Sequence, residues 1–89
     1  MLTITLDFCR LADRDALYRT LAQQSHCPSA FGNNLDALWD WLTGGMALPA
    51  RIYLRHAAGL ENSDEFAAVL ELLEEAAQAL DGDLRLQRD

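Results

Sequence analysis

Two aspartates stand four residues apart in the segment FGNNLDALWDWLTGG, which covers residues 31 to 45. On a helix this spacing places Asp36 and Asp40 on the same face, one turn apart. Paired carboxylates can take part in acid/base chemistry, coordinate a metal ion, or bind a cationic partner. A fourth interpretation is that the pair lies on a solvated helix surface with no specific role.

The helix predicted for this segment is about ten residues long, and its dipole favours Asp36 in the first turn. Asn33 or Asn34 can cap its start, and Gly44-Gly45 provides a C-terminal stop where a left-handed residue is favoured. Asp40 falls in the last turn, where the helix dipole opposes a negative charge by about 0.3–1 kcal/mol. No Lys or Arg lies between positions 20 and 50 to offset this cost. The unfavourable charge pattern therefore favours a functional role for the pair.

Helical periodicity also divides this segment into an acidic side and an apolar side. Asp36, Asp40 and Thr43 fall on one strip, which we call the acidic strip. The adjoining apolar side consists of Leu35, Leu38, Trp39 and Leu42. Trp39 therefore lies on the border between the two sides, whereas Trp41 flanks the apolar side at its other edge and is predicted to pack.

The charge of the whole chain excludes several classes of partner. The chain has 89 residues, which predicts one domain spanning residues 1–89. Its 14 acidic residues exceed the 7 basic ones, all of them arginine, so the net charge is −7 at pH 7. Nucleic acids and anionic membranes bind through cations on the protein, so this charge disfavours both. A macromolecular partner is expected to be a basic protein, although an acidic surface also serves solubility alone.

The sequence shows no segment that would span a membrane or direct export. No apolar run approaches the ~20 residues that cross a bilayer. The start, MLTITLDFCR, lacks the charged and apolar regions of a signal peptide. We therefore expect a cytoplasmic protein, in which Cys9 and Cys27 are reduced thiols because they lack CxxC or zinc-type spacing. A disulfide between these two cysteines is the alternative.

Strand and helix patterns alternate along the chain. The predicted strands cover residues 2–6, 50–55 and 83–87. Between the first two strands, Asp13 can cap a helix over residues 14–24 that buries Leu17, Tyr18 and Leu21. The helix that carries the two aspartates follows it. A later helix begins with a capping-box pattern of Asn62 and Glu65 and ends at Gly82, with apolar positions Phe66, Val69, Leu70, Leu73, Ala76, Ala77 and Leu80. Strands separated by helices pair in parallel, so we predict an α/β fold with a small three-stranded parallel β-sheet and packed α-helices.

The stretch FGNNLDALWDWLTG resembles the signature of the barstar family, whose members are intracellular protein inhibitors of secreted ribonucleases. The run NLDALWD followed by LTG carries the resemblance, and the order of elements agrees with a barstar-like domain over the whole chain. In barstar, helix carboxylates enter the cationic active site of the ribonuclease in place of substrate phosphates. The resemblance thus implies that Asp40 is the central anchor, supported by Asp36 and by Glu75 of the late helix. It also implies a surrounding contact surface made of Asn34, Trp39, Thr43 and Gly44.

Several positions depart from the barstar pattern. Ala30 and Gly45 stand where barstar has a tyrosine and a tryptophan, so two aromatic contacts are missing. Asn33 replaces a glutamate and Trp41 replaces a cysteine. These departures leave two hypotheses open: inhibition of a ribonuclease in a one-to-one complex, or a barstar-like acidic interaction module for a basic partner that is not a ribonuclease.

An enzymatic role for the aspartate pair requires a concave pocket and a nearby histidine or third ligand. His26 precedes Pro28 in a predicted loop, and His56 follows a strand. Isolated histidines of this kind are more commonly surface or hydrogen-bonded residues. The sequence therefore predicts no catalytic residues, no metal site and no cofactor.

Overall fold

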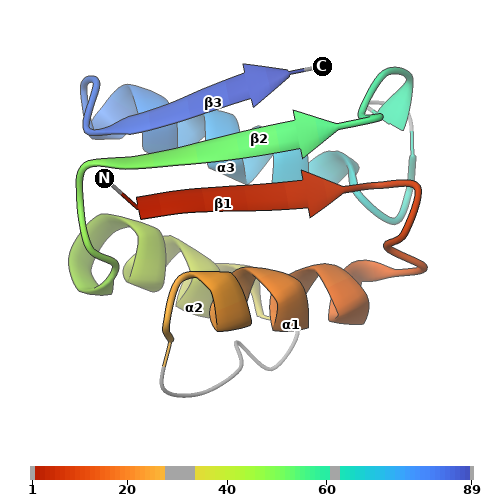
Figure 1. Ribbon diagram of the computed structural model, residues 1–89, viewed down its shortest axis with the longest axis horizontal. Helices are drawn as coiled ribbons and strands as arrows, with labels where there is room; N and C mark the ends of the chain where they lie inside the picture. Colours follow the sequence, from red (N-terminus) through yellow and green to blue (C-terminus); the bar gives the residue numbers. More distant parts are fainter. Residues whose placement is uncertain (1, 28–33, 61–62, 89) are drawn as a thin grey trace.

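Three parallel strands form a sheet in the order β1-β2-β3 in the computed structural model, which describes residues 2–27, 34–60 and 63–88. The strands are β1 (Leu2–Asp7), β2 (Ala50–Arg55) and β3 (Leu84–Arg88) (Figure 1). The predicted α/β fold with a three-stranded parallel sheet is confirmed. Three strand ends differ by one residue from the prediction: pairing extends to Asp7 opposite Arg55 and to Arg88 opposite Leu54, and β3 begins at Leu84 in place of residue 83.

The alternation of side chains gives the sheet one buried face and one open face. The face covered by helices carries four completely buried side chains, those of Ile4, Leu6, Ile52 and Leu54. The alternate residues form what we call the open face, which consists of Thr3, Thr5, Asp7, Arg51, Tyr53, Arg55, Arg85 and Gln87. Figure 1 looks onto the strands with helix α3 (Ala67–Ala79) passing behind them. Only one face of the sheet therefore contributes to the hydrophobic core.

Helix α1 (Arg14–Gln24) has the start that its sequence predicts. The Asp13 carboxylate accepts a hydrogen bond from the Ala16 backbone N–H at 2.9 Å, which satisfies one of the unpaired donors of the first turn. Its predicted apolar side is also confirmed, since Leu17, Tyr18 and Leu21 are all buried.

Helix α3 begins at Ala67, later than the capping-box pattern predicts. Asn62 lies outside the described residues. The Glu65 carboxylate accepts a hydrogen bond at 2.6 Å from the backbone N–H of Arg14, the first residue of α1. Glu65 thus satisfies a donor at the start of a different helix, and this contact ties the segment before α3 to α1.

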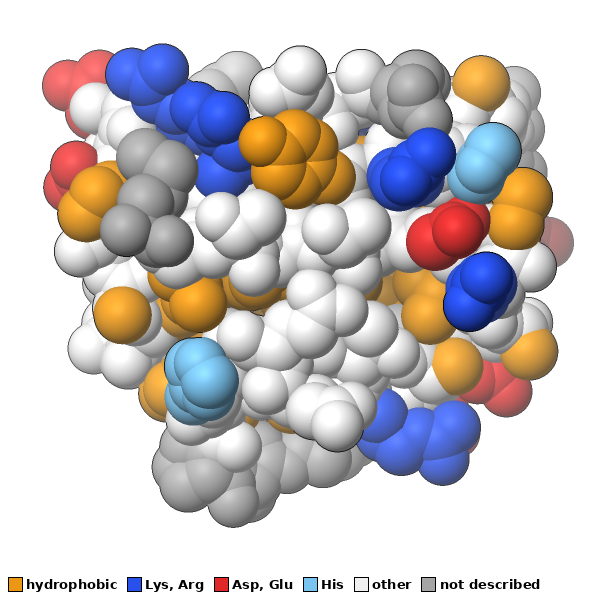
Figure 2. All heavy atoms as spheres, in the orientation of Figure 1, with side chains coloured by type: hydrophobic (Ala, Val, Ile, Leu, Met, Phe, Trp, Pro, Cys, Tyr) orange, Lys and Arg blue, Asp and Glu red, His pale blue; other side chains and the backbone are white. Residues whose placement is uncertain are grey.

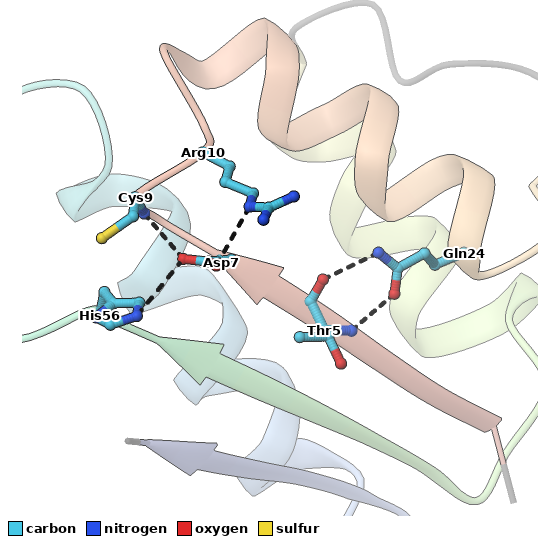
Figure 3. Close-up of polar contacts among 6 residues, drawn as sticks. All are labelled: Thr5, Asp7, Cys9, Arg10, Gln24 and His56. Carbon is cyan, nitrogen blue, oxygen red and sulfur yellow. Dashed lines mark hydrogen bonds and ion pairs between the residues drawn. The ribbon is translucent and has the colours of Figure 1, made fainter.

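The outer edge of β1 is covered by a side chain of α1. The Gln24 amide donates to the Thr5 carbonyl at 2.9 Å, and its Oε1 accepts from the Thr5 N–H at 2.7 Å (Figure 3). Unpaired backbone groups on an edge strand are a template for pairing with another chain. The Gln24 side chain occupies both groups of Thr5 and so blocks this edge at its centre.

Cys9 and Cys27 are not bonded to each other in the structure, so the alternative of a disulfide between them is not supported. Within the described residues, no helix combines the length and apolar character needed to cross a bilayer.

Burial of Tyr18 makes a prediction about stability at alkaline pH. Tyr18 is 2% exposed, and loss of hydration raises the pKa of its phenol above the ordinary value of 10.0, with nearby Arg14 opposing the shift and Asp15 adding to it. A phenol whose pKa is higher in the folded protein than in the unfolded chain stabilises the folded protein fully at a pH below the pKa of the unfolded chain. This contribution is lost as the pH rises through the pKa of the folded protein.

We expect the free energy of unfolding to fall above about pH 10, and to fall less in Tyr18→Phe. Urea denaturation across this range measures the effect, with Tyr53→Phe on the open face as the control that keeps the decline. Equal slopes for wild type and Tyr18→Phe would contradict the prediction.

Candidate partner-binding site

The aspartate pair lies on α2 (Leu35–Asp40), whose start is fixed by Asn34. The Asn34 Oδ1 accepts hydrogen bonds from the backbone N–H groups of Asp36 at 2.8 Å and Ala37 at 3.4 Å. Of the two predicted caps, Asn34 is therefore the one used, while Asn33 lies outside the described residues. Because the cap orients the first turn, it also fixes the direction in which Asp36 points.

Asp36 and Asp40 are both exposed, one turn apart on α2. Leu38, between them in sequence, is completely buried and anchors the opposite side of the helix in the core. In the described part of the chain, the ion pairs are formed by the carboxylates of Asp7 and Glu74, and neither aspartate of α2 takes part in one. The pair is thus held on a rigid element with its negative charge presented to solvent.

The helix continues beyond Asp40 as a π-helical turn, η1 (Trp41–Gly45). The Met46 N–H donates to the Trp41 carbonyl at 2.7 Å, the wide-turn hydrogen bond that closes it. The chain then leaves in an extended conformation at Met46. The predicted left-handed stop at Gly44-Gly45 is wrong, because the glycines with positive φ in the described residues are Gly59 and Gly82.

A close contact with Trp41 explains the glycine at position 45. A Cβ atom added to Gly45 would lie 2.5 Å from Cε3 of the Trp41 ring, which is too close for any side chain. The ring is held from its other end, since Trp41 Nε1 donates to the hydroxyl oxygen of buried Ser25 at 2.9 Å. Trp41 is therefore a packing residue, as predicted, and it requires Gly45 beneath it. A Cβ added at Gly44 meets nothing within 4 Å, so this exposed glycine leaves open space beside the acidic strip.

Trp39 and Thr43 lie at the border between core and solvent. Trp39 is half-buried and packs against the core, in agreement with its predicted border position. The Thr43 hydroxyl donates to the Trp39 carbonyl at 2.7 Å, four residues earlier. This bond fixes the Thr43 side chain on the helix, and leaves its oxygen as an acceptor at the edge of the acidic strip.

Glu75, the third carboxylate that the resemblance assigns to the site, lies on a second helix. It is exposed on α3, and α3 packs against both α2 and η1. The neighbouring Glu74 points to the other side of α3, where it forms an ion pair with Arg88 of β3. Glu71 is exposed as well, one turn before Glu75. Helical spacing alone does not say whether the two acidic helix surfaces are near each other. The structure shows that they belong to helices that pack together.

The open face carries three arginines and one carboxylate, Asp7, so its net charge is opposite to that of the acidic strip, which was not predicted. Arg51, Arg55 and Arg85, three of the seven arginines, share it with Tyr53, whose hydroxyl accepts from Arg51 Nη1 at 3.2 Å. Figure 2 looks onto this face and shows blue side chains across its upper half. The face is hollowed by a depression of about 350 Å³ lined by Thr5, Tyr53, Arg55, Gln87 and Arg88. The alternation of arginine and apolar residues in ARIYLR is the sequence signal that would have identified it.

The fold and the acidic helices define the class of protein. It is a small α/β protein whose sheet is covered by helices on one face, and it exposes carboxylates on two adjoining helices. The chain belongs to the barstar family, since the family described as Barstar (barnase inhibitor) matches residues 1–88. A relative from Bacillus subtilis (strain 168), named "Putative ribonuclease inhibitor YrdF", is 32% identical over 91 residues, with 97% of each chain covered. The resemblance stated from the sequence is confirmed.

Proposed function

We propose that this protein inhibits a ribonuclease by binding the basic active site of the enzyme through its acidic helix surface. Membership in the barstar family and the name of the Bacillus subtilis relative support a role as a ribonuclease inhibitor. The whole chain acts as one domain in the cytoplasm, in a one-to-one complex and without chemistry of its own. The ribonuclease is the only macromolecule it binds in this proposal, which includes neither nucleic acid nor membrane.

The observation that carries the proposal is the exposed carboxylate pair of α2. Like charges at this spacing destabilise a helix by about 0.2–0.5 kcal/mol, and the dipole at the helix end opposes Asp40. Yet the helix that carries them is fixed by the Asn34 cap and by buried Leu38. A fixed pair of carboxylates suits a cationic cleft for two reasons. The cations of the partner neutralise the repulsion between the carboxylates on binding, and the helix that carries them loses little conformational freedom.

Each residue of the surface has a distinct role in this complex. Asp40 is the central anchor in the enzyme's cationic site, and Asp36 and Glu75 provide electrostatic support on either side of it. Trp39 supplies apolar contact area at the border of the strip. Three smaller residues complete the contact surface: Asn34, Thr43 and Gly44.

The test is a titration of a purified basic ribonuclease, first isolated by affinity capture on the wild-type protein at low and moderate salt. We expect nuclease activity to disappear at one inhibitor per enzyme. The variant Asp36→Asn/Asp40→Asn should neither retain nor inhibit the enzyme. The control Asp15→Asn/Asp81→Asn removes the same charge from exposed positions on α1 and in the turn after α3, and it should inhibit normally.

Three outcomes would contradict the proposal. Capture of a basic protein without nuclease activity would assign the acidic surface to a different kind of partner. Equal inhibition by the Asp36/Asp40 variant would place the interface elsewhere. Equal loss of inhibition in both double variants would mean that overall charge, rather than this strip, determines binding.

A further inference from the structure

Three side chains of different ligand type meet at the carboxyl ends of β1 and β2, away from the acidic strip. They are Asp7, Cys9 and His56, and their ligand atoms all lie within 4.8 Å of one another (Figure 3). Asp7 ends β1, and His56 directly follows β2. Parallel strands bring their carboxyl ends to the same edge of the sheet, so residues that are far apart in sequence become neighbours here.

Backbone hydrogen bonds hold this arrangement in place. Asp7 pairs with Arg55 in the sheet, and the Phe8 N–H donates to the Arg55 carbonyl at 3.0 Å, so the pairing continues past the end of β1. The chain then turns, with the Cys9 N–H donating to Asp7 Oδ1 at 3.1 Å and the Arg10 N–H to the Asp7 carbonyl at 2.9 Å. The turn brings Cys9 back beside Asp7, and so the donor atoms are positioned before any ligand arrives.

The spacing of these atoms is close to that of a tetrahedral metal site. Zinc bonds of roughly 2.0–2.3 Å place ligand atoms about 3.5 Å apart. His56 Nε2 is already 4.0 Å from Asp7 Oδ1. Cys9 and His56 are exposed, so small side-chain rotations can close the remaining gap without disturbing the core.

We propose that Asp7, Cys9 and His56 bind one zinc ion, with water in the fourth position. A thiolate together with an imidazole selects zinc over magnesium and calcium, which prefer oxygen ligands alone. The ion would join the ends of β1 and β2 and so stabilise the folded state relative to the unfolded chain. The opposing feature is Arg10, whose Nε lies 3.9 Å from Asp7 Oδ2. Arg10 is 87% exposed, so its side chain can move into solvent when a cation binds.

Cobalt(II), a spectroscopic substitute for zinc, tests the site directly. The reduced full-length protein is titrated with Co²⁺ and then with Zn²⁺, and we expect one ion per chain with a thiolate-to-cobalt charge-transfer band that Zn²⁺ abolishes. Cys9→Ser should remove the band. Cys9→Ser and His56→Asn should each weaken Zn²⁺ binding by about tenfold or more, because even changes around a ligand cost about 10–100-fold. Asparagine is chosen for position 56 because the residue has φ 58°, a left-handed conformation that asparagine adopts readily.

The chain supplies its own matched controls, since it has two cysteines and two histidines in all. Cys27→Ser and His26→Asn should leave both the band and the affinity unchanged. Melting temperatures measured with a chelator should agree between wild type and Cys9→Ser, and added Zn²⁺ should raise only that of the wild type. Absence of the thiolate band, loss of the band in Cys27→Ser, or an equal rise of the melting temperature in Cys9→Ser would each overturn the proposal.

Discussion

Replacing Asp40 by asparagine is expected to weaken the complex with the captured ribonuclease by about 2–5 kcal/mol. This is the range known for removing one partner of a buried charge pair at protein interfaces, and the interfaces on which it is based include those of the barstar family. The substitution keeps the shape of the side chain and removes only its charge. In the free protein it should raise the free energy of unfolding by a few tenths of a kcal/mol, because it removes the repulsion from Asp36 and the unfavourable interaction with the helix dipole. Binding and stability are therefore expected to change in opposite directions.

Surface plasmon resonance over a range of salt concentrations, together with urea denaturation, measures both effects. The dissociation rate should rise most, and the association rate should become less dependent on salt. Asp15→Asn, an exposed helix aspartate on α1, is the control that changes net charge equally and should leave the dissociation rate unaltered. An Asp40→Asn variant that binds like the wild type, or that binds weakly because it has lost stability, would contradict this role of Asp40.

Introducing a side chain at Gly45 should destabilise the fold, because the Trp41 ring occupies the space. A Cβ at this position would lie 2.5 Å from Cε3 and 2.8 Å from Cζ3 of that ring. The hydrogen bond from Trp41 to Ser25 resists displacement of the ring. We expect Gly45→Ala to lower the free energy of unfolding by about 1–3 kcal/mol, as overpacking of a well-packed site does, and Gly45→Trp to lower it further.

A double-mutant cycle separates this clash from other effects of losing a glycine. In a Trp41→Cys background the ring is gone, so Gly45→Trp should cost much less than it does alone, giving a coupling energy of at least about 1 kcal/mol. Gly44→Ala is the control, since a Cβ there meets nothing within 4 Å. Independent costs at positions 41 and 45 would refute the packing argument.

Local patterns predicted the elements well where a single segment contains the whole signal. The alternation of buried and open positions in β2 and the side-chain caps of Asp13 and Asn34 are examples, because the interacting groups lie within a few residues of one another. The assignment of Trp41 to packing was also correct, although its hydrogen-bond partner, Ser25, belongs to the end of α1.

Features that depend on contacts between distant segments were missed. The π-helical turn η1 carries Trp41, whose ring bonds to Ser25 and lies over Gly45, and no pattern within LTGG indicates either the turn or these contacts. Glu65 was assigned to its own helix, whereas it bonds to the start of α1. The packing of α3 against α2 and η1, the segments that carry the acidic strip, likewise follows from the fold and not from helical spacing.

Three arginines lie on the open face of the sheet, whereas Asp36, Asp40 and Glu75 lie on helices that cover its other face, so charges of opposite sign are separated across the sheet. A dipole in the field of a cationic surface is subject to a torque, which acts over distances of about 8 Å at physiological ionic strength. In the proposed complex with a basic ribonuclease, an approach with the arginines foremost would be repelled locally, and an approach with the helices foremost would be attracted. The charge distribution would then favour the binding orientation before contact, and fewer encounters would end in a misaligned complex than net charge alone would give.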